Sequence, residues 1–307
     1  MILLWGLLDE RPIALVNEAL ARLGHSPAFF DQRREPTATI ELSVDRGVEG
    51  AITDGSQRID LGAVTAFYTR PYDPRDVLEA QGFGERSGEV AGVVKFEDIL
   101  MSWSEMTDAL VVNRLAASSS NSSKPYQALL IRPMGFDIPE TLITTDPEAV
   151  QDFLSRHEGA IYKSVSGVRS IVSRFKAADR SRLEDVRWSP TQFQEYVRGT
   201  DYRVHVVGDE VFACRVVSDA DDYRYASRQG GSVEVRACDL PGEIADRCVR
   251  TTRKMGLAVG GIDLRLTPDG RWFCFEVNPS PGFSFYQDAT GQPIADAIAR
   301  LLIAGRV

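Results

Sequence analysis

One hairpin constrains this chain more than any other feature. Residues 260–283 read as two apolar strands joined by a Pro-Asp-Gly turn. In the second strand Glu276 and Asn278 are two residues apart, so their side chains point to one face. Antiparallel pairing across the turn can bring Asp263 to the same face. Two carboxylates and an amide oxygen are hard ligands, suited to Mg²⁺ that a nucleotide's phosphates also hold.

A surface hairpin with solvated acids is the alternative to this metal site. Glu276 lies between Phe275 and Val277, in a strand too apolar for a merely solvated face. Pro279 and Pro281 then end the strand, because proline lacks the N–H that a ladder needs. We therefore prefer the metal site to the solvated hairpin.

Charge and cysteine content exclude several classes of function. The net charge of -9 makes nucleic acid or an anionic membrane an unsuitable partner, so an anionic nucleotide needs a local cluster of Lys and Arg. The four cysteines (Cys214, Cys238, Cys248 and Cys274) show no CxxC spacing, which argues against a zinc site or a disulfide framework. No apolar run approaches the roughly 18 residues of a membrane span.

The first 112 residues indicate an α/β module with a partly parallel sheet. Strands are expected near 2–8, 27–31, 40–44, 63–68 and 109–113, with helices over 12–23 and 90–109. The opening Met1–Leu8 resembles a buried first strand, not a signal peptide, and we expect a cytoplasmic protein. Arg70 ends a strand at the sheet edge where ligands bind in such folds, but a plain surface arginine fits equally well.

The second part of the chain predicts α+β structure. A Ser-rich link over 113–126 leads into a helix capped by Ser122 or Ser123, which stops at Gly135. Strands follow near 139–146, 160–165, 171–175 and 192–197, with a helix over 147–156. A hairpin of 201–207 and 211–218 turns at 208–210. A three-residue turn puts Arg203 and Arg215 on one face, whereas a two-residue turn puts them on opposite faces. Helices over 241–255 and 293–302 are also expected.

Several spaced motifs together resemble the ATP-grasp ligases, and within them the RimK-like carboxylate–amine ligases. The motifs are Ser-Lys-Pro-Tyr-Gln around Lys124, Ile-Tyr-Lys around Lys163, Gln-Glu-Tyr-Val at 194–197, Gly-Thr-Asp-Tyr-Arg at 199–203, Gly-Ile-Asp at 261–263 and the run 275–283. The early Phe-Tyr-Thr-Arg-Pro is similar to the subgroup that crosslinks ribosomal peptides, the graspetide or microviridin type.

The resemblance implies an ATP-grasp fold, two α+β lobes gripping ATP, after a pre-ATP-grasp α/β domain. Its domains would be a pre-ATP-grasp domain over 1–112, a small lobe over 113–193 and a large lobe with the metal site over 194–307. In this family ATP phosphorylates a substrate carboxylate, and an amine or hydroxyl attacks the acyl phosphate, releasing ADP and phosphate. The implied cofactors are ATP and Mg²⁺, as two ions, which Mn²⁺ can replace.

The resemblance also assigns residues to roles. Lys124 and Lys163 would contact the phosphates, Ser166, Gly167 and Ser170 would fold over them, and Asp201 would bind the ribose. The hinge Gln194, Glu195, Tyr196 and Val197 would pair with adenine through its backbone, and Asp263, Glu276 and Asn278 would hold the metal. Without the family, Lys163 could be a solvent-facing strand lysine, Lys124 a surface helix-start lysine and Asp201 an ordinary hairpin acid.

Arg203, Arg215 and Arg265 are the candidate catalytic residues, since fixed cations stabilise a transferring phosphoryl group. Many relatives carry an arginine two residues before the metal-binding Asp, where this chain has Gly261. Arg265 could equally face solvent, and we expect His205 to be a packed or surface histidine and not a base. The loop residues Asp221, Asp222, Tyr223, Arg224 and Arg228 would approach the acceptor, or form a solvated loop.

The expected partners are a carboxylate substrate and an amine or hydroxyl acceptor, such as a ribosomal precursor peptide, in a homo-oligomer. A free amino acid or small amine is the alternative acceptor. The competing hypothesis is a non-catalytic nucleotide-binding or regulatory protein on the same scaffold, against which the complete set of converging charges argues.

Overall fold

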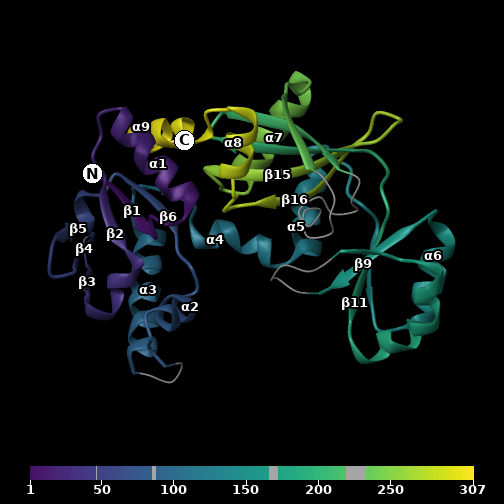
Figure 1. The fold of residues 1–307 in the computed structure, drawn as a ribbon, viewed down its shortest axis with the longest axis horizontal. Coiled ribbons are helices and arrows are strands. Elements are labelled where there is room, and N and C mark those ends of the chain that lie inside the picture. Colours follow the sequence, from purple (N-terminus) through teal and green to yellow (C-terminus); the bar gives the residue numbers. More distant parts are fainter. Residues whose placement is uncertain (46, 85–87, 166–171, 219–232) are drawn as a thin grey trace.

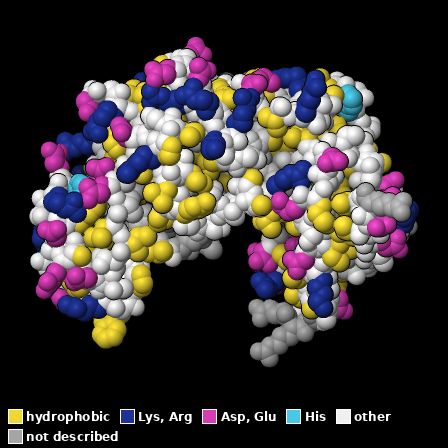
Figure 2. Space-filling view, turned by 180° about the vertical axis from the view of Figure 1, so that it is seen from behind, with side chains coloured by type: hydrophobic (Ala, Val, Ile, Leu, Met, Phe, Trp, Pro, Cys, Tyr) yellow, Lys and Arg dark blue, Asp and Glu magenta, His cyan; other side chains and the backbone are white. Residues whose placement is uncertain are grey.

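The structure of the protein is a computed structural model that describes residues 1–45, 47–84, 88–165, 172–218 and 233–307. Figure 1 shows three bodies in a row: an N-terminal domain, a central lobe that contains α7 and β15, and an outer lobe that contains α6 and β9. From behind, a broad hollow separates the N-terminal domain from the outer lobe (Figure 2). Within the described residues, no helix has the length and apolarity to cross a bilayer.

The N-terminal domain is built on a four-stranded sheet, and its expected parallel pairing is confirmed. The order is β2 (Ala28–Asp31), β1 (Ile2–Gly6), β6 (Ala66–Arg70) and β7 (Leu110–Val112), all parallel. One face packs against α1 (Arg11–Arg22) and α9 (Ile294–Ala304). The other face packs against α3 (Gly88–Met106), with α2 (Pro74–Ala80) beside it. The helix near the C-terminus therefore completes the core of the first domain.

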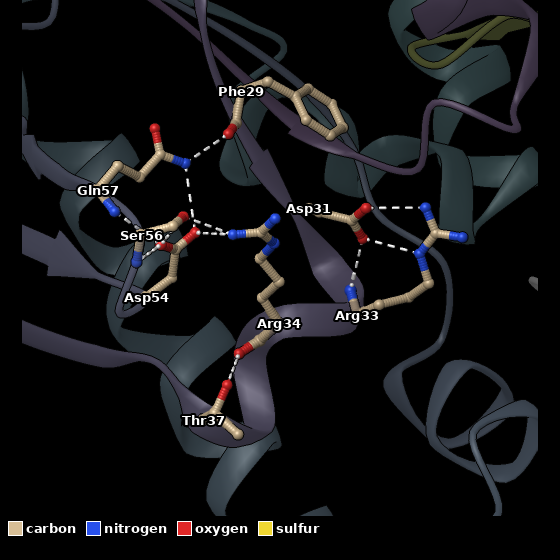
Figure 3. Close-up of polar contacts among 8 residues, drawn as sticks. All are labelled: Phe29, Asp31, Arg33, Arg34, Thr37, Asp54, Ser56 and Gln57. Atoms are coloured by element: carbon tan, nitrogen blue, oxygen red, sulfur yellow. Dashed lines mark hydrogen bonds and ion pairs between the residues drawn. The ribbon is translucent and has the colours of Figure 1, made fainter.

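A small antiparallel sheet is attached to this domain, and two of its strands were not expected from the sequence. It consists of β3 (Thr39–Val44), β4 (Val48–Thr53) and β5 (Arg58–Asp60). Polar contacts join the turn between β4 and β5 to β2 and to the short helix η1 (Gln32–Thr37) that follows it (Figure 3). Gln57 Nε2 donates to the carbonyl of Phe29 in β2 at 2.8 Å, and Arg34 in η1 donates to Ser56 Oγ at 2.6 Å. The expected strand over 40–44 exists, but in this sheet and not in the parallel one.

Short helices replace the Ser-rich link. They are α4 (Leu115–Ser118), η3 (Ser119–Ser122), α5 (Lys124–Ile131) and η4 (Arg132–Met134). As expected, Ser123 caps α5 by accepting from the N–H of Tyr126, and Gly135, at φ 91°, ends the segment. Ile131 and Phe136 pack in the core of the central lobe, so this segment is structurally part of that lobe.

The outer lobe has its own core. Its antiparallel sheet has the order β10 (Ser173–Arg174), β9 (Ala160–Ser164), β11 (Thr191–Glu195), β8 (Thr141–Thr144). Helix α6 (Pro147–Arg156), capped by Asp146, and η5 (Ala177–Trp188) cover one face, where Phe153, Leu183 and Phe193 are buried together. The other face of β9 and β11 is directed toward the central lobe.

The central lobe is a five-stranded antiparallel sheet. Its order is β14 (Val233–Cys238), β13 (Glu210–Ser218), β12 (Thr200–Val207), β15 (Val259–Leu266), β16 (Trp272–Asn278). One face is apolar and packs on α5 and α7 (Gly242–Lys254), whereas the other carries the polar residues of the hairpin. Helix α8 (Ser284–Thr290) follows β16. Alternation along each strand thus separates the core from the candidate site.

Candidate functional site

An open cleft lies between the outer and central lobes. The strands of the outer lobe contribute one wall, the segment leaving β11 forms the back, and the central sheet forms the other wall. Its lining is Ile161, Lys163, Val172, Gln194, Glu195, Tyr196, Val197, Asp201, Tyr202, Asp263, Leu264, Arg265, Phe275 and Glu276. Nine residues predicted for the site from sequence therefore converge here.

The expected carboxylate pair is present. Asp263 on β15 lies directly opposite Glu276 on β16, and Gly261 lies opposite Asn278, so the three polar side chains share a face. A β-bulge follows, since Leu264 pairs with Cys274 and leaves Phe275 as the extra residue. Both carboxylates are largely buried, with side chains 15% and 19% exposed.

Each carboxylate has a cation beside it. Lys124 Nζ lies 3.1 Å from Glu276 Oε2, and Arg203 donates to Asp263 Oδ1 at 2.8 Å. Lys124 also donates to Asn121 Oδ1 at 2.7 Å. The alternative of a plain surface lysine at the start of α5 is therefore wrong. Paired cations let two carboxylates stay close together in a half-buried site.

These oxygens fit Mg²⁺ better than a metal that needs a full protein cage. Among the residues described, no three His, Cys, Asp or Glu side chains converge as a metal-binding group. Two carboxylates and the Asn278 amide would leave coordination positions for phosphate oxygens and water, as Mg²⁺ prefers. The Asn278 Oδ1 also accepts from the N–H of Ser280 at 2.8 Å, which fixes its orientation.

Arg203 crosses the backbone at Gly261. A Cβ at position 261 would collide with the Arg203 guanidinium and would lie 2.6 Å from Pro281 Cβ. Glycine is therefore required there, because only a residue without a side chain leaves room for Arg203 beside Asp263. Arg203, from the neighbouring strand β12, thus supplies the positive charge that an arginine at position 261 supplies in many relatives.

Arg215 does not join this cluster. The β12–β13 turn has two residues, Gly208 and Asp209, and Glu210 already pairs with Val207. Arg203 consequently pairs with Cys214, and Arg215 pairs with Tyr202 on the other face of the sheet. Of the two registers considered from sequence, the two-residue turn is the observed one. The grouping of Arg215 with Arg203 is therefore wrong.

Arg265 is bound within the protein. Its Nε and Nη2 donate to the two carboxylate oxygens of Asp201 at 2.6 and 2.8 Å, and its Nη1 donates to the carbonyl of Val197 at 2.7 Å. Its guanidinium also lies 5.1 Å from the centre of the Phe275 ring. The alternative of a solvent-facing strand arginine is wrong, since this side chain is only 15% exposed.

The outer lobe presents Lys163 to the cleft. Its neighbour Tyr162 packs on the opposite face with Phe175 and Phe193, which places Lys163 on the cleft side of β9. Ser164, which follows Lys163, is exposed. The predicted loop residues Ser166, Gly167 and Ser170 lie outside the described residues, as do Asp221, Asp222, Tyr223, Arg224 and Arg228.

Backbone contacts hold the hinge between the lobes. The N–H of Glu195 donates to the carbonyl of Glu140 at 2.9 Å, and the N–H of Tyr196 donates to Gly159 at 2.9 Å. The side chain of Gln194 donates to Thr141 Oγ1 at 3.1 Å, and Glu195 Oε1 accepts from the N–H of Glu140 at 3.0 Å. These contacts fix the segment that forms the back of the cleft.

His205 is a packed residue, as expected. It is buried, and its ring centre lies 5.1 Å from that of Tyr286. Burial, helped by the positive charge of Arg203, holds the pKa of His205 well below its usual value of 6.5. No hydrogen-bond partner for either ring nitrogen occurs among the described residues, so the imidazole is a neutral packing element.

Two buried amides were missed in the sequence. Gln127 on α5 hydrogen-bonds the backbone of Val277, and Asn113 after β7 hydrogen-bonds Val259 and Pro279. Single polar residues in uncharged surroundings carry no pattern in one sequence. The only available signal is that Gln127 lies one helical turn after Lys124.

Arg70 is also bound, at the edge of the parallel sheet. Its guanidinium pairs with Glu10 at 2.6 Å and donates to Ser280 Oγ at 3.0 Å, just after the metal-site strand. Of the two alternatives, surface arginine or ligand-binding arginine, the surface one is wrong, because the side chain is largely buried and joins two domains. Its contacts connect the first domain to the end of the hairpin.

Comparison with known proteins matches the same regions. A model of the RimK-like ATP-grasp domain matches residues 120–302. A probable alpha-L-glutamate ligase of Xanthomonas oryzae pv. oryzae is 33% identical over 185 residues, which cover 56% of this chain and 61% of that protein. One of Rhodopirellula baltica is 26% identical over 293 residues, covering 91% of this chain and 69% of that protein. This chain thus spans about three-fifths of the Xanthomonas protein.

Two solved structures resemble the whole chain. The ATP-grasp ligase PsnB, complexed with a phosphomimetic variant of its minimal precursor, Mg and ADP, is 29% identical with a TM-score of 0.80. The alignment covers 99% of this chain and 98% of that one. The macrocyclase MdnC of Microcystis aeruginosa MRC, bound with precursor peptide MdnA, is 25% identical with a TM-score of 0.79, covering 99% of both chains.

Proposed function

The chain belongs to the RimK-like ATP-grasp family, and on that premise we propose that it is an ADP-forming carboxylate ligase acting on a peptide. The observation that carries the proposal is the opposed pair Asp263 and Glu276, each next to a cation, on the wall of a cleft between two lobes. A non-catalytic nucleotide-binding protein would have no need to keep these buried charges close together.

Asp263, Glu276 and Asn278 would hold Mg²⁺, which supplies charge neutralisation to the phosphates when bound. The related PsnB structure contains Mg and ADP, which supports both as ligands of this family's cleft. We propose two ions, with Mn²⁺ as a substitute, because carboxylate and amide oxygens suit both metals. When no metal is bound, Lys124 and Arg203 balance the charge of the carboxylates.

The nucleotide would enter along the hinge. The carbonyl of Glu195 and the N–H of Val197 would pair with the adenine edge, with Gln194 and Tyr196 holding the segment in place. Asp201 would accept from the ribose hydroxyls, and Lys163 would reach the phosphates from the outer lobe. Lys124 is placed to serve a phosphate and Glu276 together, as a compact cation can. We propose that Ser166, Gly167 and Ser170 close over the phosphates.

The proposed ligation has two steps, formation of an acyl phosphate and attack on it by a nucleophile. A carboxylate oxygen of the substrate attacks the γ-phosphorus, the bond to the β-phosphate oxygen breaks, and ADP leaves. An amine or hydroxyl then attacks the acyl carbon, phosphate leaves, and one proton is released. Arg203 would neutralise charge on the transferring group, and Arg265 would act by holding Asp201 and the hinge. Arg215 has no role in these steps, since it faces away from the cleft.

A ribosomal precursor peptide is our preferred substrate, because PsnB and MdnC, which resemble this chain over its whole length, were solved with precursor peptides. The resemblance to probable alpha-L-glutamate ligases supports a second candidate, addition of free glutamate to an acceptor. A homo-oligomer also remains a proposal, as does a cytoplasmic location, which suits the four free thiols and the need for ATP.

We propose the division into a first domain over 1–112, a small lobe and a large lobe starting at 194. The sequence predicts residues 113–138 in the small lobe, but Ile131 and Phe136 pack in the core of the large lobe, so we propose that this segment belongs to the large lobe. Helix α9 also packs on α1, with Arg22 paired to Asp296 at 2.9 Å. The first domain and the large lobe therefore share a core.

The test is nucleotide turnover with defined substrates. We would incubate the protein with ATP, Mg²⁺ and either glutamate-containing peptides or free glutamate, and identify the nucleotide product and the mass change. The proposal expects ADP, not AMP, with loss of one water per bond formed in a peptide, or addition of glutamate in the second case. AMP as product, or no binding of adenine nucleotides, would overturn it.

A further inference from the structure

The metal-site strand is an edge strand. In the described part of the chain no further strand pairs with the outer side of β16. Its outer backbone groups are satisfied in two other ways. Near its start, the backbone of Asp137 accepts from the N–H of Cys274 at 2.9 Å and donates to the carbonyl of Trp272 at 3.0 Å. Near its end, the partner is a side chain.

That side chain is Gln127. Its Nε2 donates to the carbonyl of Val277 at 2.8 Å, and its Oε1 accepts from the N–H of Val277 at 2.9 Å. The side chain thus makes both hydrogen bonds that a neighbouring strand would make. It is 0% exposed, so water cannot replace either bond if it is lost.

Val277 is the residue between two of the proposed metal ligands. Glu276 and Asn278 project to the opposite face from Val277, whose own side chain is in the apolar core. A rotation of the peptide planes at Val277 would turn both ligands together. The pair of hydrogen bonds from Gln127 prevents this rotation at the one position that controls both.

Helix α5 also positions the ammonium group of Lys124. Lys124 lies one turn before Gln127 on α5 and reaches Glu276 Oε2 at 3.1 Å. One rigid helix therefore fixes the backbone at Val277 and the ammonium group next to the preceding carboxylate. This arrangement explains the spacing of Lys124 and Gln127 in the motif at 123–127.

We propose that Gln127 is a positioning residue that sets the direction of Glu276 and Asn278 toward the metal. This inference rests on the proposed function, since it concerns the same metal site. Gln127 would not touch nucleotide or metal itself. A merely structural role would lower thermal stability, whereas a positioning role also weakens metal binding, as outer-shell partners of metal ligands generally do.

The test compares two substitutions in α5. Gln127→Met keeps the length of the side chain but removes both hydrogen bonds, and Ile131→Ala removes buried apolar volume one turn later without changing a bond to β16. For each protein we would measure the melting temperature, the affinity for Mn²⁺ in the presence of ADP by electron paramagnetic resonance, and the Mg²⁺ dependence of ADP formation.

We expect Gln127→Met to weaken Mn²⁺ binding about tenfold or more, within the range for outer-shell partners. Ile131→Ala should lower the melting temperature and leave the Mn²⁺ affinity unchanged. Unchanged affinity in Gln127→Met, or an equal loss in Ile131→Ala, would overturn the inference alone. If the wild-type protein with ADP binds no Mn²⁺, the proposed function fails and the inference fails with it.

Should Gln127→Met not fold, Gln127→Glu provides the same test through pH. A protonated glutamic acid can make both hydrogen bonds to Val277, whereas a carboxylate cannot donate to its carbonyl. We expect Mn²⁺ affinity close to wild type at acidic pH and a loss, relative to wild type at the same pH, as pH rises. A ratio to wild type that stays constant up to a pH at which the introduced carboxyl is shown to ionise would contradict the role of Gln127.

Discussion

Arg265 and Asp201 form a bidentate ion pair between the adjacent strands β15 and β12, with N–O distances of 2.6 and 2.8 Å. The third nitrogen of Arg265 donates to the carbonyl of Val197 in the hinge. Arg265 therefore connects the residue proposed to bind ribose with the segment proposed to bind adenine. Because these donors bind Asp201 and Val197, we expect Arg265 to affect nucleotide binding through Asp201 and the hinge.

We predict that Arg265→Ala mainly weakens ATP binding. Asp201 and the hinge lose their shared support, so the KM for ATP should rise about tenfold, equivalent to about 1.4 kcal/mol, with a smaller change in kcat. Steady-state kinetics and calorimetric titration with ADP would measure this. Asp201→Asn is the matched variant, and the double variant should lose less than the sum. A loss confined to kcat would instead place Arg265 at the phosphoryl group.

Removing a proposed metal ligand should abolish turnover and preserve the fold. Glu276 lies on the face opposite the core, so Glu276→Ala should lower ADP formation by about a hundredfold or more with an unchanged circular dichroism spectrum. Lys163→Ala should do the same from the other wall of the cleft. Undiminished ADP formation in either variant would contradict the assigned roles.

The two hairpin arginines should behave differently. Arg203→Ala removes the cation next to Asp263 and should reduce kcat about a hundredfold or more, because fixed donors stabilise the transferring charge. Arg215→Ala lies on the other face of the same sheet and should retain turnover within about twofold. Parallel assays of ADP release at saturating ATP would check this. Equal losses would mean that the register does not separate the two roles.

A buried carboxyl pair in the first domain should make stability depend on pH. Burial raises the pKa of Glu35 well above its ordinary value of 4.5, with a further contribution from Glu97 nearby, and Trp5 Nε1 donates to Glu35 Oε1 at 2.8 Å. Because the pKa is raised in the folded state, the folded protein holds the proton more tightly. This stability is fully present below the ordinary carboxyl pKa and is lost as pH rises toward the folded-state value.

We therefore predict that Glu35→Gln flattens the pH dependence of the melting temperature. Wild type should lose several degrees relative to the variant as pH rises from mildly acidic to mildly alkaline, and the two should converge in acid. Gln can keep the bond from Trp5, so the comparison isolates the proton. Differential scanning fluorimetry across pH would measure it. Parallel profiles for the two proteins would mean that Glu35 is ionised in the fold.

Much of this fold could be predicted because its elements have strong local signals. The helix over 147–156 has an Asp cap and a proline at its first position, and the predicted bounds are those observed. The hairpin of β15 and β16 has apolar alternation and a Pro-Asp-Gly turn, so its two strands could be predicted. The pairing of Asp263 with Glu276 also needs the β-bulge at Phe275, because regular pairing from Leu264 and Cys274 would place Asp263 opposite Phe275, and the sequence does not reveal that bulge.

The rest depends on partners distant in the chain. Strands β4, β5 and β14 and helices α4 and α8 lack a distinct pattern, and η5 is stabilised by packing under the outer-lobe sheet. The face on which Arg215 lies depends on whether the turn has two or three residues, and the sequence Gly208-Asp209-Glu210 is compatible with both lengths. Gln127 belongs to the motif around Lys124, but its role could not be predicted, since its hydrogen-bond partner lies in an edge strand 150 residues later.

Asn113 connects the first domain to the central lobe. Its buried amide donates to the carbonyl of Val259, and its Oδ1 accepts from the N–H of Ala258 at 2.8 Å, which ties the end of the first sheet to the start of β15. The first domain and the central lobe are thus joined by buried contacts, whereas the outer lobe has a separate core and is connected to the rest through two segments of the chain. We therefore expect any opening of the cleft to be a swing of the outer lobe alone, so that a molecule resting against the larger body would keep its place.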